Sequence, residues 1–138
     1  MQDTNLNSLR DASSDVLARE AVKILMEHKG LDVRLYNVKE ASPITDFYVN
    51  VTGRSHTQVF SLSDILKDKL AEREITPARV EGKRGDTWIL VDYRDVIVNV
   101  FDKGSREFYN LDRLLPEGSS VDVTELEAEV DAKMMGRK

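Results

Sequence analysis

The stretch TWILVDYRDVIVNVF, residues 87–101, decides the fold of this chain. It holds two short apolar runs, 88–91 and 96–101, joined by a tight connection at 93–95. Runs that are apolar at nearly every position are typical of strands whose two faces are both covered. The stretch therefore predicts an antiparallel hairpin near the centre of a sheet.

The residues before this hairpin predict two helices and three strands. Apolar residues at helical spacing indicate a first helix between Ser13 and Gly30, and a second helix over 55–74 with Ser55 as its N-cap. Extended patterns indicate three further strands, which we expect over 31–38, 47–52 and 78–81.

The residues after the hairpin predict one more helix, over 105–115. Its apolar side chains are available to cover the sheet: Phe108, Leu111, Leu114 and Leu115. The order of elements is then α-β-β-α-β-β-β-α. This order predicts an α/β (α+β) fold, with a single mixed five-stranded sheet and helices packed on it.

The composition fits one folded domain. The chain has 138 residues, of which 41% are hydrophobic and 33% are charged, so it can bury a core. Its formal charge of −5 comes mainly from the tail, residues 117–138, which carries six acids against three bases. We expect a flexible N-terminus at 1–12, a domain at 13–116, and an acidic tail that is disordered or holds a nascent helix over 123–135.

The same composition argues against several classes of protein. The chain has no cysteine, which excludes disulfides, thiolate zinc sites and a cysteine nucleophile, and favours the cytoplasm. No apolar run approaches the ~18 residues that span a membrane, and the polar first residues contain no signal-peptide core. The folded part is nearly neutral, so we expect no binding to a membrane or to free nucleic acid.

Candidate catalytic groups are few. Ser55 and His56 with an aspartate would make a triad, but the two are adjacent at a helix start, where Ser55 already serves as the cap. Asp92 and Asp95 could hold Mg²⁺, although aspartates three residues apart across a turn are common turn formers. Two histidines and no cysteine argue against a transition-metal site. We therefore expect neither a metal nor a cofactor.

A longer pattern around the hairpin resembles a known family. Its parts are Glu81-Gly82, Trp88, Asp92, the run 95–101, Arg106-Glu107-Phe108-Tyr109, Leu111 and Leu114, preceded by 42–47, Val51-Thr52-Gly53 and Ser55. The order and spacing of these parts over about residues 13–115 resemble the ribosomal silencing factor family, also called Iojap-like. The family usually has His at the position of Asn99, and Glu and Trp at the positions of Asp112 and Leu115.

The resemblance implies a binding module with a nucleotidyltransferase-like core that lacks the catalytic carboxylates. Proteins of this family dock on the large ribosomal subunit, against a ribosomal protein on its intersubunit face. They thereby block joining of the small subunit and repress translation, so no enzymatic activity is expected. The residues that we expect to bind the ribosomal protein combine aromatic, aliphatic and charged side chains: Trp88, Leu90, Asp92, Tyr93, Arg106 and Tyr109.

Three other readings stay open at this point. A small nucleotide-handling enzyme of nucleotidyltransferase-like fold would need a second carboxylate near Asp92, and Asp46 is the candidate on another predicted strand. An RNA-binding domain would need clustered basic residues, of which Arg79, Lys83 and Arg84 are too few. A homodimer that pairs exposed strand edges is the third.

Overall fold

The computed structural model describes residues 7–136, so the first six residues of the expected flexible N-terminus lie outside this range. The elements follow one another as α1 (Ser14–Glu27), β1 (Leu31–Asn37), β2 (Phe47–Gly53), α2 (His56–Ala71), β3 (Arg79–Glu81), β4 (Trp88–Asp92), β5 (Val96–Asp102), α3 (Lys103–Tyr109), α4 (Leu111–Leu114), β6 (Ser120–Val121) and α5 (Thr124–Met135). The Ser13 hydroxyl accepts the N–H of Val16 at 3.2 Å, and the Ser55 hydroxyl accepts that of Gln58 at 3.1 Å. The predicted N-cap Ser55 is confirmed, and Ser13 caps α1 in the same way.

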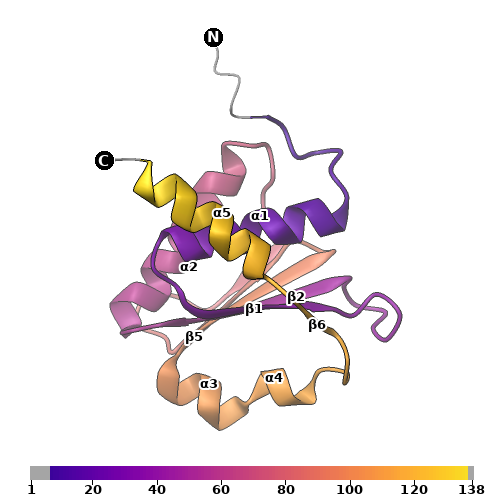
Figure 1. The fold of residues 1–138 in the computed structure, drawn as a ribbon. Helices are drawn as coiled ribbons and strands as arrows, with labels where there is room; N and C mark the ends of the chain where they lie inside the picture. Colours follow the sequence, from indigo (N-terminus) through magenta and orange to yellow (C-terminus); the bar gives the residue numbers. More distant parts are fainter. Residues whose placement is uncertain (1–6, 137–138) are drawn as a thin grey trace.

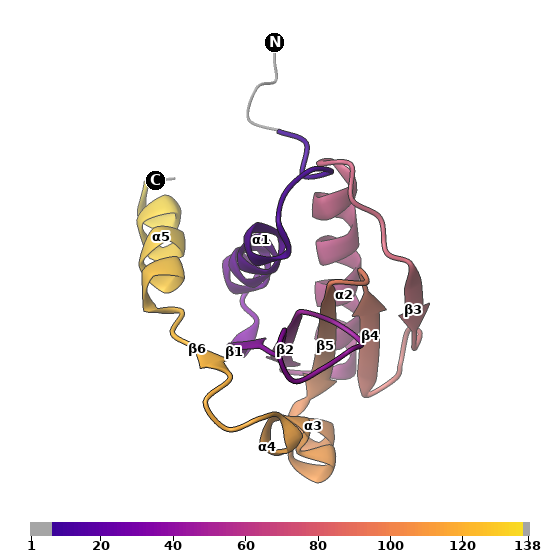
Figure 2. The ribbon, with the colours of Figure 1, turned by 90° about the vertical axis from the view of Figure 1, so that its right-hand side faces the viewer.

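One mixed sheet joins all of these strands, in the order β3-β4-β5-β2-β1-β6 (Figure 2). At its centre β2 and β5 run parallel, with Phe47 opposite Val96. Every other neighbouring pair is antiparallel, including the predicted hairpin of β4 and β5, in which Trp88 lies opposite Phe101. The predicted mixed sheet is confirmed.

The number of strands differs from the prediction, because the described chain has six and not five. The additional strand, β6, is Ser120–Val121 and pairs with β1. Two residues are too few to show the alternation by which a strand is recognised in a sequence. The two sheet edges are therefore β6 and the three-residue β3, in which Arg79 pairs with Glu81 at 2.8 Å. Both edges are short and β3 is charged, so they offer little backbone to a second copy, and the homodimer stays a prediction.

Helices α1, α2 and α5 lie on one side of the sheet, and α3 and α4 lie on the other (Figure 1). The main core fills the space between the sheet and the first group of helices. It consists of apolar residues from α1 and α2 and of alternate residues of the central strands: Leu17, Ala18, Ala21, Val22, Leu25, Val49, Val51, Val59, Leu62, Leu66, Leu70, Val98 and Val100. None of the helices in residues 7–136 is long and apolar enough to span a membrane. Because alternate strand residues face this core, the intervening residues point to the opposite side of the sheet, where α3 and α4 lie.

The acidic tail is packed on the rest of the molecule. α5 occupies the stretch in which the sequence predicts a nascent helix, and it packs along α1 (Figure 1). Leu126 and Val130 are buried, and Lys133 pairs with Glu27 of α1 at 2.9 Å. The tail therefore differs from the solvated segment that its composition indicates, because two apolar residues four positions apart give α5 a buried stripe.

Residues 7–12 are also held by contacts. Leu9 is buried, and its backbone N–H donates to the carbonyl oxygen of Arg73 at 2.9 Å. The Nε of Arg73 in turn donates to the carbonyl oxygen of Asn7 at 2.9 Å. Within the described chain, residues 7–9 thus contact the chain just beyond the end of α2, and the flexibility of the N-terminus stays a prediction.

The predicted helix over 105–115 is divided into two shorter helices. α3 begins at Lys103 because Asp102 caps it, accepting the N–H of Ser105 at 2.8 Å. Asn110 has a left-handed backbone with φ of 48°, which ends α3 and redirects the chain into α4. The break sets which side chains of this segment reach the sheet.

Candidate functional site

The side of the sheet opposite α1 and α2 holds much of the predicted binding surface. Strand alternation places Trp88, Leu90 and Asp92 of β4 on this side, whereas Ile89 and Val91 are buried in the main core. The first three side chains are half-buried, so each presents part of its surface to solvent. α3 packs on β5 and β2, next to these residues (Figure 2).

Trp88 is fixed at its ring and at its nitrogen. The centroid of its ring lies 5.0 Å from that of Phe101 and 4.9 Å from that of Tyr109. Its Nε1–H donates to Oδ1 of Asn99 at 3.0 Å, and Nδ2 of Asn99 donates to Oδ1 of Asn50 at 3.1 Å. Both asparagines are fully buried. Asn99, one of the departures from the family pattern, thus provides the hydrogen-bond acceptor for the indole N–H of Trp88.

An exposed group of rings continues from Trp88 along α3. We term Trp88, Tyr109 and Phe108 the aromatic surface, because the ring of Tyr109 contacts that of Trp88 and lies 5.0 Å from that of Phe108. Tyr109 is 50% exposed, Phe108 is 80% exposed, and Leu114 of α4 is 76% exposed. The prediction that Phe108 and Leu114 cover the sheet is wrong, because polar residues occupy the buried side of α3.

Asp92 lies on the same side of β4 as Trp88, at the other end of the strand, and its carboxylate is partly paired. One oxygen accepts the backbone N–H of Arg94 at 2.7 Å, and the other lies 3.7 Å from Nη2 of Arg79. Burial, together with the nearby charge of Asp92, raises the pKa of Tyr48 on the neighbouring part of this face. The side chain of Asp92 is 19% exposed, which leaves it accessible to a cation of a partner.

Two of the predicted binding residues are buried. Tyr93 lies in the connection between β4 and β5, its ring belongs to the main core, and burial raises the pKa of its hydroxyl group. Arg106 is 8% exposed. Both side chains therefore offer little surface to a partner, and the binding role of Tyr93 and Arg106 stays a prediction. Sequence patterns do not show this burial, because tyrosine and arginine most often reach solvent and both lie outside the alternating strands.

Arg106 joins α3 to three other segments of the chain. Its Nε and Nη2 donate to the two carboxylate oxygens of Asp112 in α4, at 3.2 Å and 2.9 Å. Its Nη1 donates to the carbonyl oxygen of Asp32 in β1 at 2.8 Å and to Oγ1 of Thr52 in β2 at 2.9 Å. The hydroxyl of Tyr36 in β1 donates to Asp112 at 2.7 Å. We term Arg106, Asp112, Thr52 and Tyr36 the arginine clamp.

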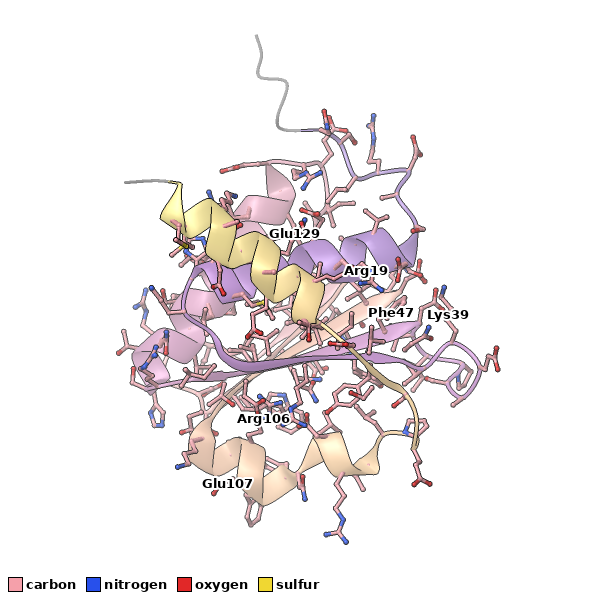
Figure 3. The ribbon with its side chains drawn as sticks, in the orientation of Figure 1. Arg19, Lys39, Phe47, Arg106, Glu107 and Glu129 are labelled. Atoms are coloured by element: carbon pink, nitrogen blue, oxygen red, sulfur yellow. The ribbon has the colours of Figure 1, made fainter. Side chains whose placement is uncertain are left out.

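The arginine clamp sets the charge state of its members. Burial alone would raise the pKa of Asp112, but hydrogen bonds from Arg106 and Tyr36 and the charge of Arg106 lower it. Burial and the carboxylate of Asp112 raise the pKa of Tyr36 to about 12. At neutral pH the clamp therefore holds a paired arginine and carboxylate with a neutral tyrosine. Figure 3 shows Arg106 between α3 and the sheet, with Glu107 on the outer side of the helix.

The adjacent Ser55 and His56 have separate roles. Nε2 of His56 lies 3.0 Å from Oδ2 of Asp102, whose other oxygen caps α3. The Ser55 hydroxyl instead caps α2. The histidine and the aspartate link the starts of two helices, and the serine is absent from this pair.

The carboxylates singled out for Mg²⁺ have other partners. Asp46 accepts a hydrogen bond from the hydroxyl of Ser14 in α1 at 2.7 Å, and Asp92 has the contacts described above. In residues 7–136, His, Cys, Asp and Glu side chains form no group of three or more that could hold a metal ion. The nucleotide-handling enzyme stays an alternative prediction.

The basic residues considered for RNA binding are partly engaged as well. Arg79 pairs with Glu81 and approaches Asp92. The guanidinium of Arg84 lies 4.3 Å from the ring centroid of Phe60, so it stacks on α2. Two of the three basic residues considered for RNA binding are thus engaged in contacts within the described chain.

Comparison with known proteins decides the family. A family profile described as "Ribosomal silencing factor during starvation" matches residues 11–138. The chain belongs to the ribosomal silencing factor family. The match includes the tail, which lies outside the resemblance seen in the sequence.

Individual proteins agree with this assignment. A ribosomal silencing factor from Halalkalibacterium halodurans is 34% identical over 111 residues, which cover 80% of this chain and 95% of its own. A mouse protein named "Mitochondrial assembly of ribosomal large subunit protein 1" is 28% identical over 97 residues, which cover 67% of this chain and 42% of its own. A crystal structure from Chromobacterium violaceum superposes with a TM-score of 0.72 at 24% identity, covering 83% of this chain and 98% of its own, and thus has the same fold.

Proposed function

We propose that this ribosomal silencing factor binds the large ribosomal subunit through the aromatic surface together with Leu90 and Asp92. In this proposal it docks against a ribosomal protein on the intersubunit face. The bound factor occupies space that the small subunit needs, so the subunits do not join and translation is repressed. The role requires no chemical step and no cofactor, and it assigns the protein to the cytoplasm, where bacterial ribosomes assemble.

The observation that carries the proposal is the aromatic surface itself. Phe108 and Tyr109 are 80% and 50% exposed, although apolar rings of this size are normally buried. Within the aromatic surface, Trp88 is held in place by Asn99 and Phe101. Rings on a rigid support lose little conformational freedom on binding, and aromatic residues dominate the binding energy of protein interfaces.

The chemistry beside the aromatic surface favours a basic protein as the partner. Asp92 keeps a partly exposed carboxylate on the same side of β4 as Trp88 and Leu90, at the opposite end of the strand from Trp88. Ribosomal proteins bind RNA and are therefore rich in basic residues, which a carboxylate at the rim of an interface attracts. The names of two relatives, one for ribosome silencing and one for assembly of the large subunit, support the ribosome as the place of action.

Steric exclusion sets a requirement on affinity. Bound factor suppresses subunit joining by the factor 1 + [L]/Kd, where [L] is the concentration of free factor and Kd is its dissociation constant for the large subunit. A tenfold suppression therefore needs free factor at about nine times Kd. The free energy for repression comes entirely from the docking contact.

Sedimentation with isolated ribosomal subunits tests the proposal. Phe108→Ala removes a side chain from the aromatic surface, and Met135→Ala is the matched control, because Met135 is 67% exposed and lies on α5, across the sheet. We expect the wild type and Met135→Ala to sediment with the large subunit alone and to reduce reassociation. We expect Phe108→Ala and Trp88→Ala to weaken both effects by about tenfold or more.

The contrary outcomes are distinct. A wild-type protein that sediments with neither subunit would refute the proposed function for this chain. Wild-type affinity in folded Phe108→Ala and Trp88→Ala variants would show that docking uses a different face.

A further inference from the structure

Polar contacts hold α3 and α4, the segment that carries Phe108 and Tyr109 of the aromatic surface. The buried residues of α3 are Ser105 and Arg106, and α4 has none. Leu111 and Leu115 are half-buried, so apolar burial contributes less here than in α1, α2 and α5. Helices of seven and four residues are too short to be stable without tertiary contacts. The arginine clamp is therefore the main attachment of this segment to the sheet.

The geometry of the arginine clamp fixes where α3 lies relative to α4 and relative to the sheet. Nε and Nη2 of Arg106 form two parallel hydrogen bonds to Asp112, a fork that fixes α3 relative to α4. Nη1 adds bonds to Asp32 and Thr52, so the same guanidinium fixes α3 relative to β1 and β2. Lysine could not reproduce this pattern, because it lacks the planar array of donors.

We propose that Arg106 is a positioning residue for docking, which acts by holding α3 so that Tyr109 stays against Trp88. This inference rests on the proposed function. Tyr109 follows Arg106 by three positions, nearly one helical turn, so any shift or rotation of α3 moves both side chains together. Trp88 stays with the sheet, because its partners Asn99 and Phe101 belong to β5. Loss of the clamp therefore separates the two rings and divides the aromatic surface.

The chain contains its own probe of this contact. Trp88 is the only tryptophan, and the ring of Tyr109 lies 4.9 Å from its ring, so tryptophan emission and its quenching by acrylamide report the position of α3. This readout needs no ribosome. It is also specific, because a general loss of stability in a protein that remains folded would leave the contact unchanged.

The experiment compares four variants of the full chain. Arg106→Met keeps the length of the side chain and removes its donors, and Asp112→Asn removes the charged acceptor. Asp112→Glu keeps the charge, and Arg113→Met is the matched control, because Arg113 is an exposed residue of the same segment. Each variant is first checked for cooperative urea unfolding, then measured by acrylamide quenching of Trp88 and by affinity for isolated large subunits.

We expect Arg106→Met to increase the quenching of Trp88 and to weaken subunit binding by about tenfold or more. Asp112→Asn should change both readouts in the same direction, while Asp112→Glu and Arg113→Met stay close to the wild type. Rescue by the conservative glutamate distinguishes a charged clamp from mere packing volume.

Several results would overturn the inference. Wild-type quenching or wild-type affinity in folded Arg106→Met would each do so, the first because α3 has not moved and the second because docking does not depend on its place. If Arg106→Met does not fold, identical behaviour of Asp112→Asn and Asp112→Glu would overturn it instead. Absence of binding by the wild type would refute the proposed function, and with it the role in docking, whereas the quenching data would still report whether Arg106 positions α3.

Discussion

Replacing Leu126 by alanine would test whether α5 is docked on α1. Leu126 and Val130 are each 5% exposed, and they are the buried residues of α5. Burying one such side chain contributes about 1.5 to 3 kcal/mol, so the two give α5 a gross docking free energy of about 3 to 6 kcal/mol. The conformational entropy lost in ordering the helix opposes this gain, so the net docking free energy is smaller.

The unfolding free energy lost in Leu126→Ala can be estimated, and it has an upper limit. Leu126→Ala removes buried methyl groups and leaves a gap on α1, which should cost about 2 to 3 kcal/mol of unfolding free energy. Once α5 has separated from α1, it has no further docking free energy to lose. The double variant Leu126→Ala/Val130→Ala should therefore cost less than the sum of the two single variants.

Urea unfolding followed by circular dichroism gives these free energies, and amide hydrogen exchange locates the change. We expect faster exchange in 124–135 and unchanged protection in β2 and β5. Met135→Ala, in the same helix but 67% exposed, should stay within about 0.5 kcal/mol of the wild type. If Leu126→Ala matched this control, α5 would not be docked and the tail would be solvated, as its composition alone indicates.

Two further predictions concern the other side of the sheet. The pKa of Asp112 lies below its ordinary 3.8, so its ionised form stabilises the fold above that value, and this stability is lost as the pH falls through the lower pKa of the folded state. The difference in unfolding free energy between the wild type and Asp112→Asn should accordingly shrink on acidification, and a difference independent of pH would contradict this. Asn99→Ala removes the acceptor of the Trp88 N–H and should cost about 1 to 3 kcal/mol in urea unfolding, so an unchanged midpoint would argue against the buried hydrogen bond.

The elements that could be predicted from the sequence are those with a local signal. The hairpin over 88–101 follows from two apolar runs, and the starts of α1 and α2 follow from Ser13 and Ser55. Alternation along β4 likewise suffices to put Trp88, Leu90 and Asp92 on one side. β6 and the docking of α5 were not predictable, because each depends on contacts with residues far away in the chain.

The same distinction applies to the candidate site. An arginine is exposed by default, and nothing near Arg106 in the sequence indicates that one of its acceptors, the carbonyl oxygen of Asp32, is 74 residues away. The exposure of Phe108 could not be predicted from the sequence either, because an apolar residue in a short helix normally faces the sheet. The left-handed tendency of Asn110 could have indicated that the helix ends there, but it does not show which side of α3 meets the sheet.

The parallel pairing of β2 with β5 also sets the earliest time at which the centre of the sheet can form. Asn50 and Asn99 lie opposite one another in these strands and are 49 residues apart in the chain. At a synthesis rate of about 5 to 20 residues per second, β2 waits about 2.5 to 10 s for its neighbour. During that interval the hairpin of β1 and β2 can form locally, but one edge of β2 stays unpaired. We expect the aromatic surface to be assembled only after β5 and α3 have left the ribosome, because Asn99 and Phe101 of β5 hold Trp88 and because Phe108 and Tyr109 belong to α3.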